Sequence, residues 1–292
     1  MARANRAVAA TLASLDLVSV RYRLTILGIV VAAWFGTIGD PWLGYDAHAY
    51  WAVRPWSPYT FDGSPDQYNA FRYSPAAAQV FSIVHVLPWP VFALLWFALL
   101  ATLVVWLARG WTLAVLAFIP IPWDIYFGNI DVLLAAAIIA GFRYPATWSI
   151  VLLTKGTPGV GLLWFAVRRE WRQLAIALGV TAAIAGVSFL AAPGLWFEWP
   201  QAILGVAHRP GVPIVALRVG AAALLIAWGA RTDRRWTVVV GATLALGWLD
   251  IKTSALLVGL AAFLPPLHQD PIRAAFPVEA RGGGSGRARA AR

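Results

Sequence analysis

The residues best suited to chemistry lie in a long polar stretch, 39–75, which reads GDPWLGYDAHAYWAVRPWSPYTFDGSPDQYNAFRYSP. A loop of this length is usually functional or disordered, and its many Trp and Tyr residues argue against disorder. Asp46 lies among aromatic residues, where a carboxylate can act as a general base or bind a metal. Asp40, which precedes a proline, is the second catalytic candidate. The structural alternatives are a helix cap or a solvated loop acid for Asp46 and a turn for Asp40.

Three basic residues are candidates for binding a phosphate. Lys155 interrupts the apolar run VLLTKGTPGVGLL, and a lysine in such a position is costly and usually functional. Gly156 and the proline two residues later break the helix and release backbone N–H groups that can bind an anion. Snorkelling of Lys155 to headgroups is the alternative. Arg72, in FRYSP, needs an anionic partner, either a phosphate or a loop acid, and Arg209 is the third candidate.

The remaining polar residues give a set of candidate substrate contacts, namely His48, Tyr50, Tyr73, Asn129 and His208. For Asn129 and Asp131, capping of the helix that follows is at least as good an interpretation as a role in catalysis. Asp250 and Lys252 are close enough in sequence to pair with each other. No carboxylate cluster and no histidine spacing indicates a metal site, so we expect no metal and no other cofactor, although the sequence does not exclude a divalent ion.

The composition is that of an integral membrane protein. Of 292 residues, 60% are hydrophobic and only 12% are charged, with a mean hydropathy of +0.70. Soluble domains carry about 25% charged residues. The net charge of +10 does not indicate nucleic-acid binding, because the basic residues form short clusters between apolar runs, as in cytoplasmic loops. The absence of cysteine excludes disulfide and thiol chemistry.

The apolar runs predict an all-α polytopic membrane protein. We expect a basic cytoplasmic N-terminus over 1–22, a transmembrane domain over 23–265 and a disordered basic cytoplasmic tail over 266–292. Residues 39–88 form the first outer loop and an interfacial or re-entrant helix, since 75–88 is too short to span. The expected spans are 23–38, 90–108, 111–123, 129–142, 146–155, 157–167, 172–192, 214–230, 236–249 and 251–264.

Charge predicts the orientation. With the N-terminus in the cytoplasm, most of the 23 basic residues fall on the cytoplasmic side and most of the 13 acids fall outside. The polar loop and the breaks near Asn129, Lys155 and Asp250 then lie together on the outer face. This one-sided gathering favours an interfacial enzyme that uses a lipid-linked sugar. A transporter or scramblase, the alternative class, needs polar residues along a route to both sides.

Four segments together resemble a known family. GYDAHAYW, FRYSPAAAQVFSIVHVLP, FGNIDVLL and LLTKGTPGVGLLWFAVRREWR are similar to the polyprenyl-phosphate-mannose-dependent mannosyltransferases of glycosyltransferase family 87, in the GT-C superfamily. The resemblance covers about residues 23–265. The chain departs from the family pattern at Ser74, where a proline is common, and at Asp131, where an apolar residue is usual.

The resemblance implies a GT-C-like bundle of about ten transmembrane helices in the cell membrane, with the active site outside. It implies a polyprenyl phosphate sugar, with mannose as the sugar, as donor and a glycan or glycolipid hydroxyl as acceptor. Asp46 would be the general base of an inverting transfer, and Lys155, Arg72 or Arg209 would bind the phosphate. A catalytically inactive GT-C-like binding protein is a further alternative.

Overall fold

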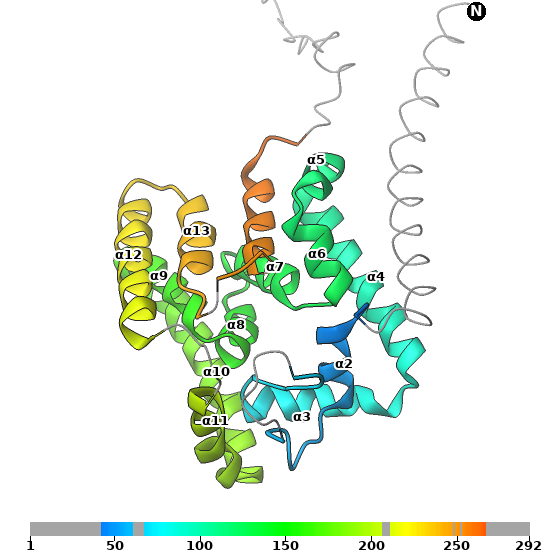
Figure 1. Cartoon of the computed structure of the whole chain (residues 1–292). Coiled ribbons are helices and arrows are strands. Elements are labelled where there is room, and N and C mark those ends of the chain that lie inside the picture. Colours follow the sequence, from blue (N-terminus) through cyan, green and yellow to red (C-terminus); the bar gives the residue numbers. More distant parts are fainter. Residues whose placement is uncertain (1–41, 61–66, 206–210, 248, 252, 267–292) are drawn as a thin grey trace, which may run out of the picture.

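The computed structural model describes residues 42–60, 67–205, 211–247, 249–251 and 253–266, and this part of the chain contains helices and no strand. The helices (Figure 1) are α2 (Tyr45–Ala52), α3 (Pro75–Ile83), η1 (Val84–Val86), α4 (Trp89–Ala108), α5 (Thr112–Ala117), α6 (Pro120–Phe127), α7 (Asp131–Gly141), η2 (Pro145–Thr147), α8 (Trp148–Thr154), η3 (Thr157–Leu162), α9 (Leu163–Val167), α10 (Trp171–Ala191), α11 (Pro193–Gly205), α12 (Val212–Arg231), α13 (Trp236–Leu244) and η4 (Thr253–Phe263). The basic N-terminus, the expected first span and the basic tail lie outside the described residues.

Three helices are long and apolar enough to cross a membrane, namely α4, α10 and α12. The pair α6 and α7 passes the same test together, but it is bent by 112° at a short break. Exposed leucines on α10 and α12, such as Leu190, Leu217 and Leu224, are what lipid-facing helices present. The described residues thus give three or four candidate spans, and the expected ten are not confirmed.

Most expected apolar segments exist as helices, but several are short. The predicted interfacial segment 75–88 forms α3 and η1, and the predicted span 111–123 is divided between α5 and α6. The division falls where Phe118 turns to an extended conformation and Pro120 begins the next helix. Proline suits the first turn of a helix and cannot continue a preceding helix, so the helix is interrupted there. The expectation of one continuous span was wrong at this point.

Helix α7 is the centre of the described bundle. It packs against α4, α8 and η4, and Figure 1 shows it between the α4–α6 group and α13. Small residues allow the close approach: a Cβ added at Gly141 would lie 2.5 Å from Trp148 Nε1, and one at Gly161 would lie 2.3 Å from the same ring. Trp148 itself is buried between them. Close packing of α8 against α7 and against η3 (Thr157–Leu162) therefore depends on these glycines.

The turn between α6 and α7 holds α2 in place. Gly128 ends α6 with φ 66°, a left-handed conformation that favours glycine. The Gly44 N–H donates to the Tyr126 carbonyl at 2.8 Å, and Trp96 Nε1 donates to the Gly128 carbonyl at 2.7 Å. A Cβ added at Gly128 would lie 2.6 Å from the Ala47 Cβ. The short helix α2 is thereby fixed to the break of the bent pair.

A serine ties α3 to the end of α8. Ser74 caps α3, because its Oγ accepts from the Ala77 N–H at 3.3 Å. The same hydroxyl donates to the Leu153 carbonyl at 2.6 Å, and the Ser74 N–H also donates to that carbonyl at 3.2 Å. Proline lacks both donors, so this departure from the family pattern has a structural role beside Lys155.

Substituting Gly128 by alanine tests the contact between α2 and the turn. We expect Gly128→Ala to destabilise the protein by about 1–3 kcal/mol, because the new Cβ strains a positive φ and meets Ala47. The thermal unfolding midpoint of the detergent-solubilised protein measures this. Gly179→Ala is the matched control, since nothing lies within 4 Å of its added Cβ and alanine favours a helix interior. Equal midpoints for the two variants would contradict the contact.

Candidate active site

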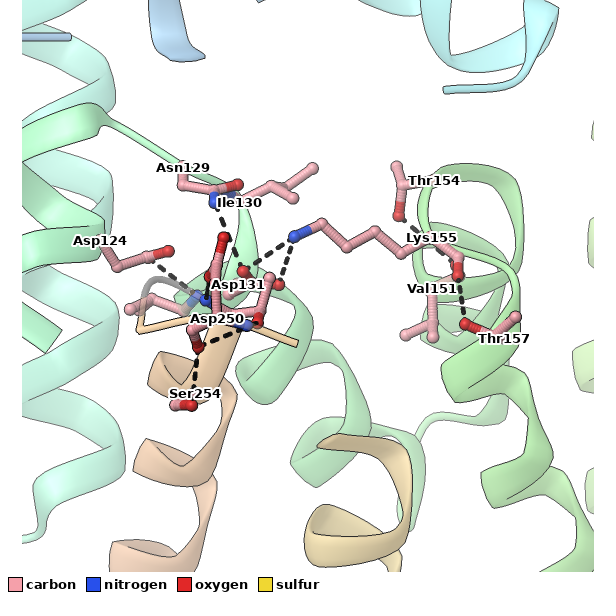
Figure 2. Close-up of polar contacts among 12 residues, drawn as sticks. Asp124, Asn129, Ile130, Asp131, Val151, Thr154, Lys155, Thr157, Asp250 and Ser254 are labelled. Carbon is pink, nitrogen blue, oxygen red and sulfur yellow. Dashed lines mark hydrogen bonds and ion pairs between the residues drawn. The ribbon is translucent and has the colours of Figure 1, made fainter. Parts of the chain in front are cut away.

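The breaks of several helices meet at one polar cluster. The cluster comprises Asp46 and Tyr50 of α2, Tyr73 before α3, Asp124, Asn129 and Asp131 of the α6–α7 region, Lys155 after α8, and Asp250 before η4. Figure 2 shows the Lys155 side chain extending toward Asp131, with Asp124, Asn129 and Asp250 nearby. The charges and polar groups of segments that are far apart in sequence therefore gather where the helices are interrupted.

The central contact is an ion pair between Lys155 and Asp131. The Lys155 Nζ lies 2.7 Å from Oδ1 and 2.8 Å from Oδ2 of Asp131. The Asp131 side chain is fully buried and that of Lys155 is 16% exposed. Asp131 is the first residue of α7 and Lys155 follows the last residue of α8. Each charge therefore has the sign that its helix end favours.

The pairing was not foreseen from the sequence, which separated these two residues into a phosphate ligand and a helix cap. Asp131 does not cap α7, whose N-cap is Ile130 without a side-chain bond. The sequence did contain a signal for this pairing: one acid and one base lie at the ends of apolar helices, where burying either charge without a partner costs free energy. The predicted phosphate role of Lys155 is untested by this contact and stays a prediction. The same holds for Gly156, which is the N-cap of η3 and has a φ of 36°.

Two other aspartates of the cluster bond to the backbone. Asp124 is fully buried, and its Oδ2 accepts from the Val132 N–H of α7 at 3.3 Å. Asp250 caps η4: its Oδ1 accepts from the Thr253 N–H, and Thr253 Oγ1 accepts from the Asp250 N–H, both at 2.8 Å. These reciprocal bonds satisfy the first amides of the helix. The pairing of Asp250 with Lys252, which the sequence left open, is untested because Lys252 lies outside the described residues.

A chain of hydroxyl and amide groups extends from α2 to the ion pair. The Tyr50 and Tyr73 hydroxyls are 2.9 Å apart, and Tyr50 donates to Asn129 Oδ1 at 3.3 Å. Asn129 Oδ1 also accepts from the Ile130 N–H at 2.7 Å. Burial raises the pKa of both tyrosine hydroxyls above the usual value, and the Asp46 carboxylate adds to both shifts. The hydroxyls are therefore protonated at neutral pH.

Asp46 differs from the buried aspartates in its accessibility. It lies on the same face of α2 as Tyr50, four residues later, and its charge acts on both tyrosines of the chain. Its residue is half-buried, whereas Asp124 and Asp131 have no exposed surface. Asp46 thus keeps some exposed surface, which the two fully buried aspartates lack.

The other face of α2 carries a row of aromatic rings, which we call the aromatic row: Trp42, Tyr45, His48, Trp51, Tyr68, His85 and Trp89. His48 is at its middle, with its ring stacked on Tyr68 at 5.0 Å and 4.7 Å from Trp89. His48 Nδ1 lies 2.6 Å from Asn69 Oδ1. Burial lowers the pKa of His48 below 6.5, so the ring is neutral at pH 7. Tyr68 and Trp42 are largely exposed.

The structure does not place every predicted residue. Asp40, His208 and Arg209 lie outside the described residues. Arg72 precedes Tyr73, and its carbonyl accepts from Trp199 Nε1 of α11 at 3.2 Å, a contact that no sequence signal indicated. No group of three His, Asp or Glu residues in the described ranges could hold a metal ion. Metal-independent chemistry therefore remains an expectation.

Comparison with known proteins decides the family. The sequence profile of glycosyltransferase family 87 matches residues 71–249, more than half of the chain. The chain belongs to glycosyltransferase family 87. The resemblance inferred from the motifs is confirmed, and the matched region includes Tyr73, Asn129, Asp131 and Lys155. Asp46 precedes it, so the assignment of the base does not rest on this match.

A curated relative is the polyprenol-phosphate-mannose-dependent alpha-(1-2)-phosphatidylinositol pentamannoside mannosyltransferase of Mycolicibacterium smegmatis. It is 29% identical over 178 residues, which cover 51% of this chain and 42% of the relative. The chain thus spans less than half the length of that relative. No solved structure matches the chain significantly. Family and relative together support a membrane glycosyltransferase.

Removing one charge of the Lys155–Asp131 pair should strongly destabilise the fold. We expect Asp131→Asn to lower the free energy of unfolding by about 3–5 kcal/mol, because a buried lysine loses its partner. Asp131→Asn with Lys155→Met should cost less than the sum of the single changes. Denaturant unfolding in micelles measures the coupling.

The matched control for this cycle is the exposed pair of Arg168 and Asp233, 2.9 Å apart. Asp233→Asn should cost about 0.5 kcal/mol or less, as is usual for surface pairs. A coupling energy for the buried pair no larger than that of the exposed pair would show that Lys155 and Asp131 do not depend on each other.

Proposed function

We propose that this chain transfers a sugar, mannose, from a polyprenyl phosphate donor to an acceptor hydroxyl at the outer side of the membrane. The observation that carries the proposal is the position of Asp46: a half-buried residue on α2, on the face that carries Tyr50 and its link to the Lys155–Asp131 region. A base and a cation thus belong to one cluster in a chain of this family.

Asp46 acts as the general base. Its carboxylate removes the proton from the acceptor hydroxyl as that oxygen attacks the anomeric carbon of the donor. The bond from the anomeric carbon to the phosphate oxygen breaks on the opposite face, and the polyprenyl phosphate leaves with the electron pair. The anomeric configuration is inverted. Because the leaving group is already an anion, its departure needs a cation rather than a strong acid.

Lys155 and Arg72 supply the positive charge for the phosphate. A lysine ammonium has three N–H donors, and the two oxygens of Asp131 lie within hydrogen-bond distance of it. The third donor serves the phosphate, while Asp131 fixes the position of the ammonium. Gly156, beside Lys155, leaves room for the close approach of a phosphate. Arg209 is retained as a third candidate cation.

The tyrosine–amide chain and the aromatic row bind the sugars. Tyr50, Tyr73 and Asn129 offer hydroxyl and amide groups beside the ion pair. His48 carries a neutral ring within the aromatic row. Flat aromatic rings next to hydrogen-bonding groups suit a sugar, which has apolar C–H faces and polar edges. The acceptor is a glycan or glycolipid, in line with the phosphatidylinositol pentamannoside in the name of the relative. In the proposed orientation, the active site lies at the outer side of the membrane and both termini lie in the cytoplasm.

The test of Asp46 is a transfer assay with polyprenyl-phosphate mannose. We expect Asp46→Asn to lower kcat by about 10²–10⁴-fold with intact folding and donor binding, because the amide cannot accept the proton. Asp233→Asn, the same chemical change at an exposed distant acid, should retain full activity. Wild-type turnover in Asp46→Asn would exclude it as the base. Sugar-lipid flux across liposomes without any turnover would instead support a transporter.

The test of Lys155 separates its binding role from its structural role. In the double variant Asp131→Asn with Lys155→Met, both charges of the pair are removed together, so the fold should be retained better than in either single variant. We expect this variant to lose donor affinity at least ten-fold, because it lacks the ammonium. Asp131→Asn alone keeps the ammonium and should still bind donor at low temperature. Unchanged affinity in the double variant would remove Lys155 from the phosphate site.

A further inference from the structure

Seven exposed arginines gather on three loops, and we call this surface the arginine-rich face. They are Arg143 after α7, Arg168 and Arg169 between α9 and α10, Arg172 at the start of α10, Arg231 at the end of α12, and Arg234 and Arg235 between α12 and α13. The acids in these loops are Glu170 and Asp233. The surface therefore carries a large excess of positive charge, and neither the family match nor the proposed transfer uses it.

Specific contacts hold the three loops together. Arg168 reaches from the α9–α10 loop to the Ala230 carbonyl at 3.2 Å and to Asp233 at 2.9 Å, while its Nε lies 2.8 Å from Glu170. Arg235 lies over the ring of Phe142 at 5.4 Å. Both acids are thus bonded to one arginine, Arg168, and the charge of the remaining arginines is not compensated within these loops.

The arginine-rich face lies at the opposite helix ends from the polar cluster. Helix α7 begins at Asp131 and ends at Gly141, beside the first loop, about 16 Å away at 1.5 Å per residue. On α12, Arg218 bonds to the carbonyl of Gly247 at 3.1 Å, and Gly247 lies three residues before Asp250 of the polar cluster. Arg231 lies 13 residues after Arg218 on the same helix, about 20 Å away. In Figure 1 the α12–α13 connection lies at the end of the bundle opposite to α2 and α3.

Exposed aromatic rings border the same surface. Tyr144, Trp171 and Trp228 are 56%, 60% and 46% exposed, and Arg234 lies 5.3 Å from the centre of the Trp228 ring. Tyr and Trp are enriched where membrane meets water. A free phosphate ion makes no apolar contact with such rings. A phospholipid has an anionic headgroup for the arginines and an apolar chain that can contact the rings.

We propose that the arginine-rich face binds the phosphate headgroups of anionic phospholipids in the leaflet that it contacts. The lipid phosphates lie against Arg231, Arg234 and Arg235, and the acyl chains lie along the exposed apolar surface of α10 and α12. Selectivity for anionic over zwitterionic lipid follows from the uncompensated charge. This inference is independent of the proposed transfer reaction.

The test is a lipid titration of the full-length protein in a neutral detergent, followed by native mass spectrometry. The probes are phosphatidylglycerol and phosphatidylcholine. We expect tighter binding of phosphatidylglycerol to the wild type. The triple change Arg231→Gln, Arg234→Gln and Arg235→Gln should lower this affinity about 100-fold, at about five-fold per arginine. The corresponding triple change to lysine should retain most of it.

Arg54→Gln is the control and should leave the affinity unchanged. Arg54 is an exposed arginine two residues after α2, at the opposite end of the bundle from the arginine-rich face. Equal binding of the two lipids, or unchanged affinity in the triple glutamine variant with intact helix content, would overturn the proposal. Competition by inorganic phosphate at lipid-like concentrations would overturn it as well, because it would indicate a free-phosphate site.

Discussion

The buried ion pair between Lys155 and Asp131 is the interaction on which the described structure depends most. Isolated charges are costly in an apolar interior, and their attraction offsets that cost only with good geometry. Here one ammonium faces both carboxylate oxygens, and each partner occupies the helix end that favours its charge. The other ion pairs among the described residues are solvent-exposed. The pair thus fixes the end of α8 against the start of α7.

The helix interruptions around this pair keep their backbone groups hydrogen-bonded. In a membrane, an interrupted helix leaves backbone groups without partners, and this is tolerated only within protein. The chain satisfies these groups locally: Asp124 accepts from the start of α7, Ser74 donates to the end of α8, and Asp250 caps η4. The interruptions that create the polar cluster therefore also supply the bonds that make it stable.

The sequence predicted those features that depend on local pattern. Uninterrupted apolar runs located α4, α10 and α12 within about two residues, and short motifs identified the family. The pairing of Asp131 with Lys155 could not be predicted, because it joins residues 24 apart whose relation depends on how two helix ends pack. The division of the expected span 111–123 was missed because its total apolar content outweighed the signal of Pro120 in its second half.

The short length of α7 has a consequence for how substrates arrive. Helix α7 rises only about 16 Å from Asp131 to Gly141, about half of a hydrocarbon core of about 30 Å. If Gly141 lies at the headgroup layer of the arginine-rich face, the Lys155–Asp131 pair is recessed below the outer membrane surface, and the proposed lipid-linked donor reaches it from within the bilayer. For such a donor, the transfer rate depends on the number of donor molecules per unit of membrane area and not on a bulk concentration.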